Sequence, residues 1–574
     1  MVRAKKAKKP LSKGRLIVRR ILRTIGLLAL AALILFLILF GKTAFRLAFI
    51  YLSQGYDTVD IKLTAEQKIK DLDYMYDLAC LQNPRKELFE QAYGISYEDV
   101  YKKYRDLVAN SKTEYEFVGY MSCFIAELPG EHNNMDLPDY QMNAVDGGFQ
   151  MIDLYGYKDV KDHICSYKEA FRDEVKKYAD HKAIIFSYIE GKYIAYIPNG
   201  KEGYKTVDTY AGGELVKLNG KDPADMCFNV FERYTPSIDS KTKKCFRSNL
   251  IFNDKSGEKF EAEILMPDGK TVTAVIYDDP GFDIQLFDAK RIYPEPGEKP
   301  DGEQTPSSEE VFSENYVATS YKIEKDKDRK LVYINSLVCD AREGNRIAQD
   351  IQAAIDEVDA DTIILDLRQN GGGTSSFANK QLLPVLFSHD VEFAPKVVGK
   401  YNKQTREFNN TFNKLFFKGS KIEKKDGYFY YAEDFSVKGE AKKNYKIYVL
   451  TSHRTFSTAD IIAALCKEYD GATLVGTNTG GEGIGGAPVN CILPESRLGF
   501  IYVPTVSVKY PEDGISGIEP DIFAERTVKE MFIQQELSKK GEDISSYESR
   551  KNWDNVLIKV LDIIDGERSG STGK

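Results

Sequence analysis

The sequence predicts a multidomain α+β protein with an N-terminal transmembrane helix, a helical region, a β-rich domain and an α/β core. Three observations predict it. At 574 residues the chain is too long for a single hydrophobic core. Its periodicity is helical over residues 59–129, becomes that of short alternating strands from about 183, and then alternates between strands and helices. This last pattern is typical of an α/β sheet.

The N-terminus has the pattern of a membrane anchor. Thr24–Gly41 contains eighteen residues without a charge, and ten Lys or Arg precede it with no acid among them. With its flanks this segment is long enough to span a bilayer of roughly 30 Å. The positive-inside tendency keeps residues 1–23 in the cytoplasm and the bulk of the chain outside the cell membrane. A cleaved signal peptide is the alternative, but no small-x-small cleavage pattern follows Gly41, which favours an uncleaved anchor over 24–45.

The rest of the chain divides by composition and periodicity. A Pro-, Gly- and acid-rich stretch separates the β-rich domain from the α/β core and indicates a linker. The predicted boundaries are a helical region at 57–135, a β-rich domain at 180–290, the linker at 291–312, the core at 313–535, and a C-terminal helix and tail at 536–574.

Charge and cysteine content exclude several functions. The ten N-terminal cations leave 69 of the 79 basic residues against 87 acidic ones, a net charge of −18, which argues against nucleic-acid binding. Eight scattered cysteines form no C-x-x-C pair and five histidines form no visible cluster, so we expect no metal and no cofactor. Cys227 and Cys245 are the closest pair for a disulfide, but isolated buried thiols fit equally well.

The stretch Tyr445–Tyr469 predicts a buried strand, a short turn and a helix that begins at Ser457. There a hydroxyl can project from a rigid elbow while the free N–H groups of the helix point at its target. The structural alternative is a capping box, because Asp460 follows Ser457 by three residues.

Thr362–Phe377 predicts a second strand, followed by three consecutive glycines and the start of a helix. Glycine runs occur where backbone adopts positive φ or lies close to a ligand, and amides freed by such a loop suit an oxyanion. The alternative is a tight turn, which needs fewer glycines. An oxyanion held there would have the N–H of Thr458 and one from Gly371 or Gly372 as its donors.

Four motifs in order, ILDLRQNGGG, the Ser457 elbow, LVGTNTGGEG and GISGIEPDI, resemble the S41 serine peptidases, which include C-terminal processing peptidases and tricorn-core-like enzymes. The resemblance implies a crotonase-like α/β peptidase core at 313–535 and an N-terminal helical region that serves in packing and gating. GGELVKLNGKDPAD also resembles a PDZ signature, which would make 180–290 a PDZ-like domain that holds a peptide along a sheet edge. A purely structural β-domain is the alternative.

The residue that takes the proton from the serine differs between this chain and one branch of the family. The processing branch uses a lysine in a G-x-x-T-x-G-K-G loop, but here the loop is GTNTGGEG and the lysine position holds Glu482, which excludes that dyad. His132, at the end of ELPGEH, resembles the catalytic histidine of the tricorn-like branch and could take the serine proton. His453 is too close to Ser457 in sequence to reach it well. The resemblance also implies an orienting glutamate, for which Glu512 is the candidate.

These residues predict a membrane-anchored extracytoplasmic serine endopeptidase that cleaves proteins or peptides, with Ser457, His132 and Glu512 as catalytic residues. An inactive S41-fold protein that binds peptides or ligands as a scaffold is the alternative, since the lysine is lost. An enzyme of another class on a crotonase-like core is less favoured, because no nucleotide- or coenzyme-binding motif is present.

Overall fold

The structure, a computed structural model, describes residues 56–128, 130, 132–135, 157–195, 208–233, 235–284, 321–401, 422–486, 488–508 and 517–571. The predicted basic tail, membrane anchor and linker lie outside these residues. Within them, no helix combines the length and the apolar character that a membrane span requires.

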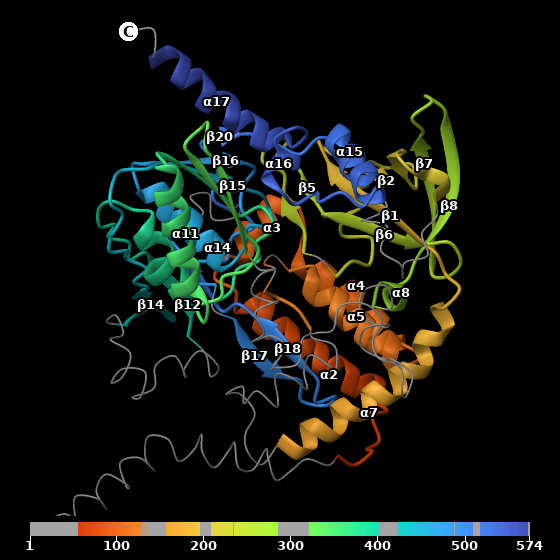
Figure 1. Ribbon diagram of the computed structural model, residues 1–574. Helices are drawn as coiled ribbons and strands as arrows, with labels where there is room; N and C mark the ends of the chain where they lie inside the picture. Colours follow the sequence, from red (N-terminus) through yellow and green to blue (C-terminus); the bar gives the residue numbers. More distant parts are fainter. Residues whose placement is uncertain are drawn as a thin grey trace, which may run out of the picture.

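The first part of the chain is helical, as predicted, because its helices bury apolar faces and three of them begin at a good N-cap. Thr64, Ser96 and Thr113 each accept a hydrogen bond from a backbone N–H of the first turn of the helix that follows. The helices are α2 (Ala65–Tyr76), which continues as a short π-helix (Asp77–Leu81), α3 (Lys86–Tyr93), α4 (Tyr97–Asn110), α5 (Glu114–Ala126) and the longer α7 (Tyr157–Val175). They share one hydrophobic core, and α2, α5 and α7 lie in the lower part of Figure 1.

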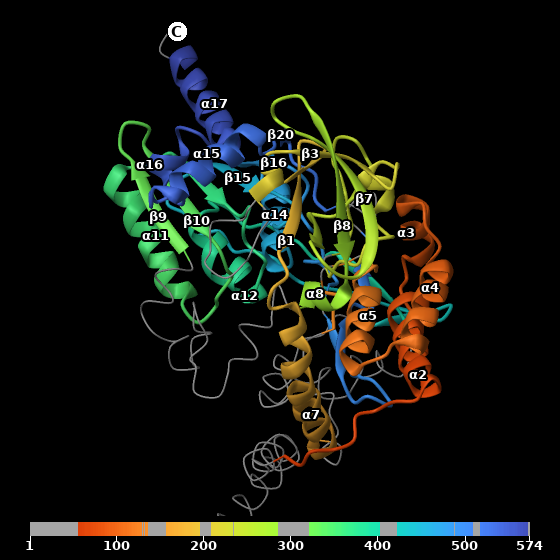
Figure 2. The same cartoon turned by 90° about the vertical axis from the view of Figure 1, so that its right-hand side faces the viewer.

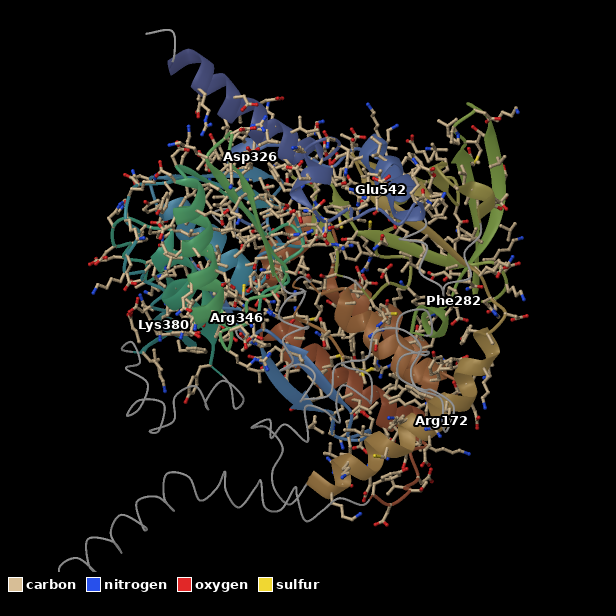
Figure 3. The ribbon with its side chains drawn as sticks, in the orientation of Figure 1. Arg172, Phe282, Asp326, Arg346, Lys380 and Glu542 are labelled. Carbon is tan, nitrogen blue, oxygen red and sulfur yellow. The ribbon has the colours of Figure 1, made fainter. Side chains whose placement is uncertain are left out.

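The β-rich domain is a closed barrel of six strands in the order β1-β2-β3-β7-β8-β6. Its strands are β1 (Ala183–Ile189), β2 (Lys192–Ala195), β3 (Glu214–Leu218), β6 (Asn249–Asn253), β7 (Glu258–Leu265) and β8 (Thr271–Asp278). After β8, helix α8 (Pro280–Ile284) carries Phe282 into the core of the helical region (Figure 3). The strands of the barrel explain the alternating strand pattern of the sequence from about residue 183. That residues 180–290 form a PDZ-like domain stays a prediction.

The α/β core contains a six-stranded sheet in the order β20-β16-β15-β11-β10-β9. Its strands are β9 (Tyr321–Asp326), β10 (Leu331–Ser336), β11 (Thr362–Asp366), β15 (Lys446–Thr451), β16 (Ala472–Gly476) and β20 (Ile522–Phe523). All neighbours pair in parallel except β9, which lies antiparallel to β10 at the edge. The predicted α/β core is therefore confirmed.

Helices cover both faces of this sheet, because its strands are apolar on both sides. Helices α11 (Gly344–Val358) and α14 (Thr458–Glu468) pack on one face, and α17 (Asn555–Ser571) packs on the other. Figure 2 shows α11 and α17 with the sheet between them. The carboxyl ends of β11 and β15, which are adjacent and parallel, open at the same edge of the sheet. In open α/β sheets this edge is the usual place for a site.

Two segments from late in the chain connect the three parts. The hairpin of β17 (Val489–Ile492) and β18 (Gly499–Tyr502) packs into the core of the helical region, beside α2 in Figure 1. Helix α15 (Val528–Lys539) packs Met531 against β1 and β2 of the barrel. A second, four-stranded sheet consists of β13 (Glu423–Lys425), β14 (Tyr428–Ala432), β12 (Lys396–Lys400) and β19 (Thr505–Ser507).

Candidate active site

Ser457 lies at a strained elbow between β15 and α14. Its backbone has φ 57° and ψ −121°, a region that residues other than glycine rarely adopt and that is often found at functional sites. Its side chain makes no capping hydrogen bond. The capping-box interpretation is therefore wrong: Asp460 instead accepts hydrogen bonds from Thr479 Oγ1 (2.6 Å) and the N–H of Gly483 (3.1 Å).

The glycine loop after β11 lies directly against this elbow. A Cβ on Gly372, whose φ is 102°, would be 2.5 Å from the Cβ of Ser457, so only glycine fits there. The N–H of Gly372 donates to Asn370 Oδ1 at 2.8 Å. The N–H groups of Gly371 and Thr458 make no hydrogen bond with any residue that the structure describes. Of the three predicted oxyanion donors, these two are therefore the ones available to a ligand.

His132 reaches the elbow from a distant part of the sequence. Its ring lies 4.5 Å from the ring of Phe456, centroid to centroid, and Phe456 directly precedes Ser457. Strand β18 holds the His132 segment in place: Asn134 pairs with Ile501 in both directions, at 3.1 and 2.8 Å, and Asn133 Oδ1 accepts from Val503 N–H at 2.9 Å. No direct hydrogen bond joins His132 to Ser457, a common situation in unliganded sites.

The other two candidates for catalytic residues are Glu512 and His453. Glu512 is outside the residues that the structure describes, so its predicted role stays a prediction. His453 is in the turn before Ser457, where its ring meets the ring of Phe246, in the short strand before β6, edge-on with centroids 5.9 Å apart. Burial lowers the pKa of His453 to about 3, so it is neutral at physiological pH. Its Nε2 is buried and has no partner among the described residues.

Glu482 is the residue that the sequence does not identify as part of the site. Its Oε2 accepts a hydrogen bond from the backbone N–H of His132 at 2.9 Å and lies 3.2 Å from His132 Nδ1. Asp460, beneath the same loop, is fully enclosed, and burial raises the pKa of its carboxyl to about 6. The loop Gly476–Gly483 thus carries a carboxylate, Glu482, rather than a cation, and Asp460 on α14 adds a second acidic group beneath it.

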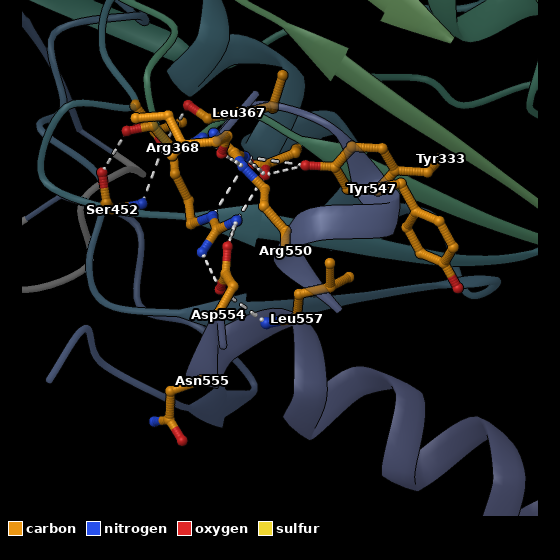
Figure 4. Close-up of polar contacts among 12 residues, drawn as sticks. Tyr333, Leu367, Arg368, Ser452, Tyr547, Arg550, Asp554, Asn555 and Leu557 are labelled. Carbon is orange, nitrogen blue, oxygen red and sulfur yellow. Dashed lines mark hydrogen bonds and ion pairs between the residues drawn. The ribbon is translucent and has the colours of Figure 1, made fainter. Parts of the chain in front are cut away.

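A buried charge network surrounds Arg368, which lies between β11 and the glycine loop in the sequence (Figure 4). Arg368, just after β11, donates to Asp366 and to both oxygens of Asp554, the latter at 2.7 Å each. Arg550 joins through Asp366 at 2.9 Å. Burial opposes ionisation of Asp366, but Arg368 and Arg550 outweigh it and hold the pKa of this carboxyl below its usual range. Ser452 Oγ, in the turn before the elbow, donates to the carbonyl of Arg368 at 2.7 Å.

A cavity of about 700 Å³ lies beside the elbow, between the core, the barrel and the helical region. Gly481, Glu482, His453, Tyr188 and Phe246 are among its lining residues. It is large enough to hold several side chains of an extended peptide. Among the described residues, no group of three or more His, Cys, Asp or Glu is arranged to hold a metal ion.

Several known proteins resemble this chain. Residues 331–524 match the model of peptidase family S41. The structure of mature CPAF is 14% identical, with a TM-score of 0.45 over 88% of this chain and 99% of that chain. The photosystem II D1 C-terminal processing protease is 11% identical, with a TM-score of 0.33 over 81% and 94%. Among curated proteins, none matches this chain in sequence.

The α/β core carries a serine at a strained elbow at its sheet edge. Residues 331–524, from the start of β10 through β20, form a peptidase family S41 domain that includes the elbow and both glycine-rich loops. The resemblance predicted from the four motifs is confirmed, and the chain is a serine-type peptidase by family.

Proposed function

We propose that this protein is a serine endopeptidase that cleaves proteins or peptides, with Ser457 as nucleophile and His132 as general base. The observation that carries the proposal is the strained Ser457 elbow, with its side chain free of any capping role and the His132 ring packed on the neighbouring Phe456. A structural serine would not need a backbone conformation that costs roughly 1–3 kcal/mol.

The reaction follows from these positions. Ser457 Oγ attacks the substrate carbonyl carbon while His132 Nε2 takes the hydroxyl proton. The N–H groups of Thr458 and Gly371 stabilise the negative charge that develops on the carbonyl oxygen. His132 then gives its proton to the leaving amine, and a water molecule repeats the sequence in reverse to release the acyl group.

The site of action is part of the same proposal. The basic N-terminal tail followed by an uncharged apolar segment supports a membrane anchor, with the catalytic bulk extracytoplasmic. Exported proteins or peptides are then the substrates. The 700 Å³ cavity beside the elbow is the candidate place for the chain being cleaved.

The test compares the wild type with Ser457→Ala on unfolded protein substrates. We expect cleavage by the wild type and a loss of at least about 10³-fold in the variant, since removing the nucleophile leaves only the residual catalysis of the remaining site. Equal cleavage by both proteins would refute the proposal. It would favour the inactive scaffold, whose binding of ligand survives both Ser457→Ala and His132→Ala.

A further inference from the structure

We infer that Cys227 and Cys245 form a disulfide that fastens one wall of the candidate substrate cavity to the barrel. Both cysteines are free thiols in the structure, and their spacing in the sequence is equally compatible with isolated thiols. The contacts of the folded chain decide between the two. The bond itself is independent of the proposed function, whereas its effect on substrates rests on that function.

The two thiols lie in contact. Cys227 follows the short 3₁₀-helix Pro223–Met226, and Cys245 begins strand β5 (Cys245–Phe246), eighteen residues further along the chain. The thiol of Cys245 donates a hydrogen bond to the sulfur of Cys227, which lies 3.9 Å from the carbonyl oxygen of Cys245. A disulfide requires two side chains that converge, and thiols in hydrogen-bonding contact meet this requirement.

Buried contacts hold the two cysteines side by side. Arg247, two residues after Cys245, donates through Nε to the carbonyl of Cys227 at 2.7 Å and pairs with Glu127 at 2.5 Å. The N–H of Arg247 donates to the hydroxyl of Tyr193 at 2.9 Å, and this hydroxyl lies 3.6 Å from Cys227 Sγ. The side chains of Arg247 and Glu127 are fully buried, so water does not compete for these contacts. The fold therefore keeps the two thiols together.

The same contacts favour the thiolate of one partner. The hydrogen bond from Cys245 lowers the pKa of Cys227, and the charge of Arg247 and the hydroxyl of Tyr193 act in the same direction, although burial opposes them. That hydrogen bond and burial raise the pKa of Cys245. By contrast, Cys466 lies in an apolar core, and burial raises the pKa of its thiol. Cys227 is thus the sulfur that can attack as a thiolate.

Oxidation needs an external disulfide such as oxidised glutathione, a reaction typical of extracytoplasmic proteins. Cys245 is partly exposed and Cys227 is fully buried, so Cys245 exchanges first. Its sulfur bonds to one glutathione sulfur, and the other glutathione leaves as a thiol with the proton of Cys245. The sulfur of Cys227 then attacks that of Cys245, and the second glutathione leaves with the proton of Cys227. Two protein thiols are oxidised, and one external disulfide is reduced to two thiols.

The bond fastens a hairpin that forms one wall of the cavity. Strand β5 pairs with β4 (Ser237–Ile238), and each of these strands is only two residues long. Ser237, Asp239 and Phe246 of this hairpin line the cavity. With so few backbone pairs, the hairpin depends on other links to keep its place.

The hairpin also contacts the segments around the nucleophile. Phe246 directly follows Cys245, and its ring meets that of His453 in the turn before the elbow. Ser240 Oγ accepts a hydrogen bond from the N–H of Asn478, in the second glycine-rich loop, at 3.2 Å. A disulfide at Cys245 therefore holds this wall in place for a bound peptide, and reduction releases it.

The first experiment counts free thiols in the full-length protein. After incubation with oxidised glutathione, the protein is unfolded in N-ethylmaleimide and its intact mass is measured; we expect two fewer adducts than the eight of the reduced protein. Trypsin cleaves after Arg233 and Lys244, between the two cysteines, so the disulfide should join two peptides that separate on reduction. Cys165→Ser, which removes another partly exposed thiol, is the matched control and should still lose two adducts. Eight adducts after oxidation, or a disulfide between other cysteines, would overturn the inference.

The second experiment measures kcat and KM on a peptide substrate before and after reduction with dithiothreitol. We expect reduction to raise KM by roughly 3- to 10-fold, because binding must then order the released wall. The double variant Cys227→Ala/Cys245→Ala, with thermal unfolding close to that of the reduced wild type, should show the raised KM in both states. Equal KM for the oxidised and reduced wild type would overturn the link to the cavity. Equal activity of the wild type and Ser457→Ala would instead refute the proposed function, and the thiol count would still decide whether the disulfide forms.

Discussion

Replacing Gly372 by alanine tests whether the glycine loop shapes the elbow. The added Cβ would be 2.5 Å from Ser457 Cβ, and 2.8 Å from both the carbonyl oxygen of Phe456 and the N–H nitrogen of Thr458. Ordinary contacts are at 3.4–4 Å, so the elbow has to move by about 1 Å. Alanine at φ 102° adds roughly 1–3 kcal/mol of backbone strain, and overpacking adds roughly as much again.

We therefore expect Gly372→Ala to lower the free energy of unfolding by about 2–6 kcal/mol. A nucleophile displaced by 1 Å should also lose roughly 10²-fold in its rate of acylation. The assays are denaturant unfolding and the labelling rate with a fluorophosphonate, corrected for the folded fraction. The stability control is Gly371→Ala, whose Cβ would meet no atom within 4 Å and whose φ is not positive. Wild-type stability and labelling in Gly372→Ala would refute this reasoning.

Two further predictions concern the supports of the site. Asp554→Ala leaves two buried arginines, Arg368 and Arg550, to share the single carboxylate of Asp366, and should cost about 3–5 kcal/mol, measured by urea unfolding. The exposed Asp562→Ala should change stability by less than about 0.5 kcal/mol, and equal effects would count against the network. The second prediction concerns Asp460, whose carboxyl has a pKa of about 6 in the folded protein and near 4 in the unfolded chain. Because the unfolded chain releases this proton first, the free energy of unfolding should fall as pH rises from about 4 to about 6, by up to about 3 kcal/mol. Asp460→Asn should remove this decline, and a wild type and variant that change in parallel between pH 4.5 and 7.5 would contradict the assignment.

Local patterns in the sequence predict much of the fold and the elbow that carries Ser457. The strand–turn–helix pattern around Ser457 corresponds to β15 and α14, and the glycine run after β11 lies beside them because parallel neighbouring strands end at the same sheet edge. The capping-box alternative is wrong because a Ser–x–x–Asp spacing is compatible with a cap but does not require one. The backbone at Ser457 and the partners of Asp460 decide between them, and neither is visible in the sequence.

The contacts around His132 could not be predicted, because they join segments hundreds of residues apart. Nothing in the local sequence indicates that β18 pairs with Asn134, or that the loop of Glu482 lies beneath His132. The sequence does carry one signal for Glu482: a carboxylate stands where related peptidases have a lysine. The role of this carboxylate depends on the imidazole of His132 beside it, and only the tertiary structure shows that the two are neighbours.

The most direct test of the account is the intact mass of the protein after reaction with a fluorophosphonate, followed by mapping of the modified peptide. We predict one adduct per chain, located on Ser457 and absent from Ser457→Ala, with labelling strongly slowed in His132→Ala. A wild-type protein that remains unlabelled, or that labels equally fast without His132, would contradict the claim that these two residues form one catalytic site.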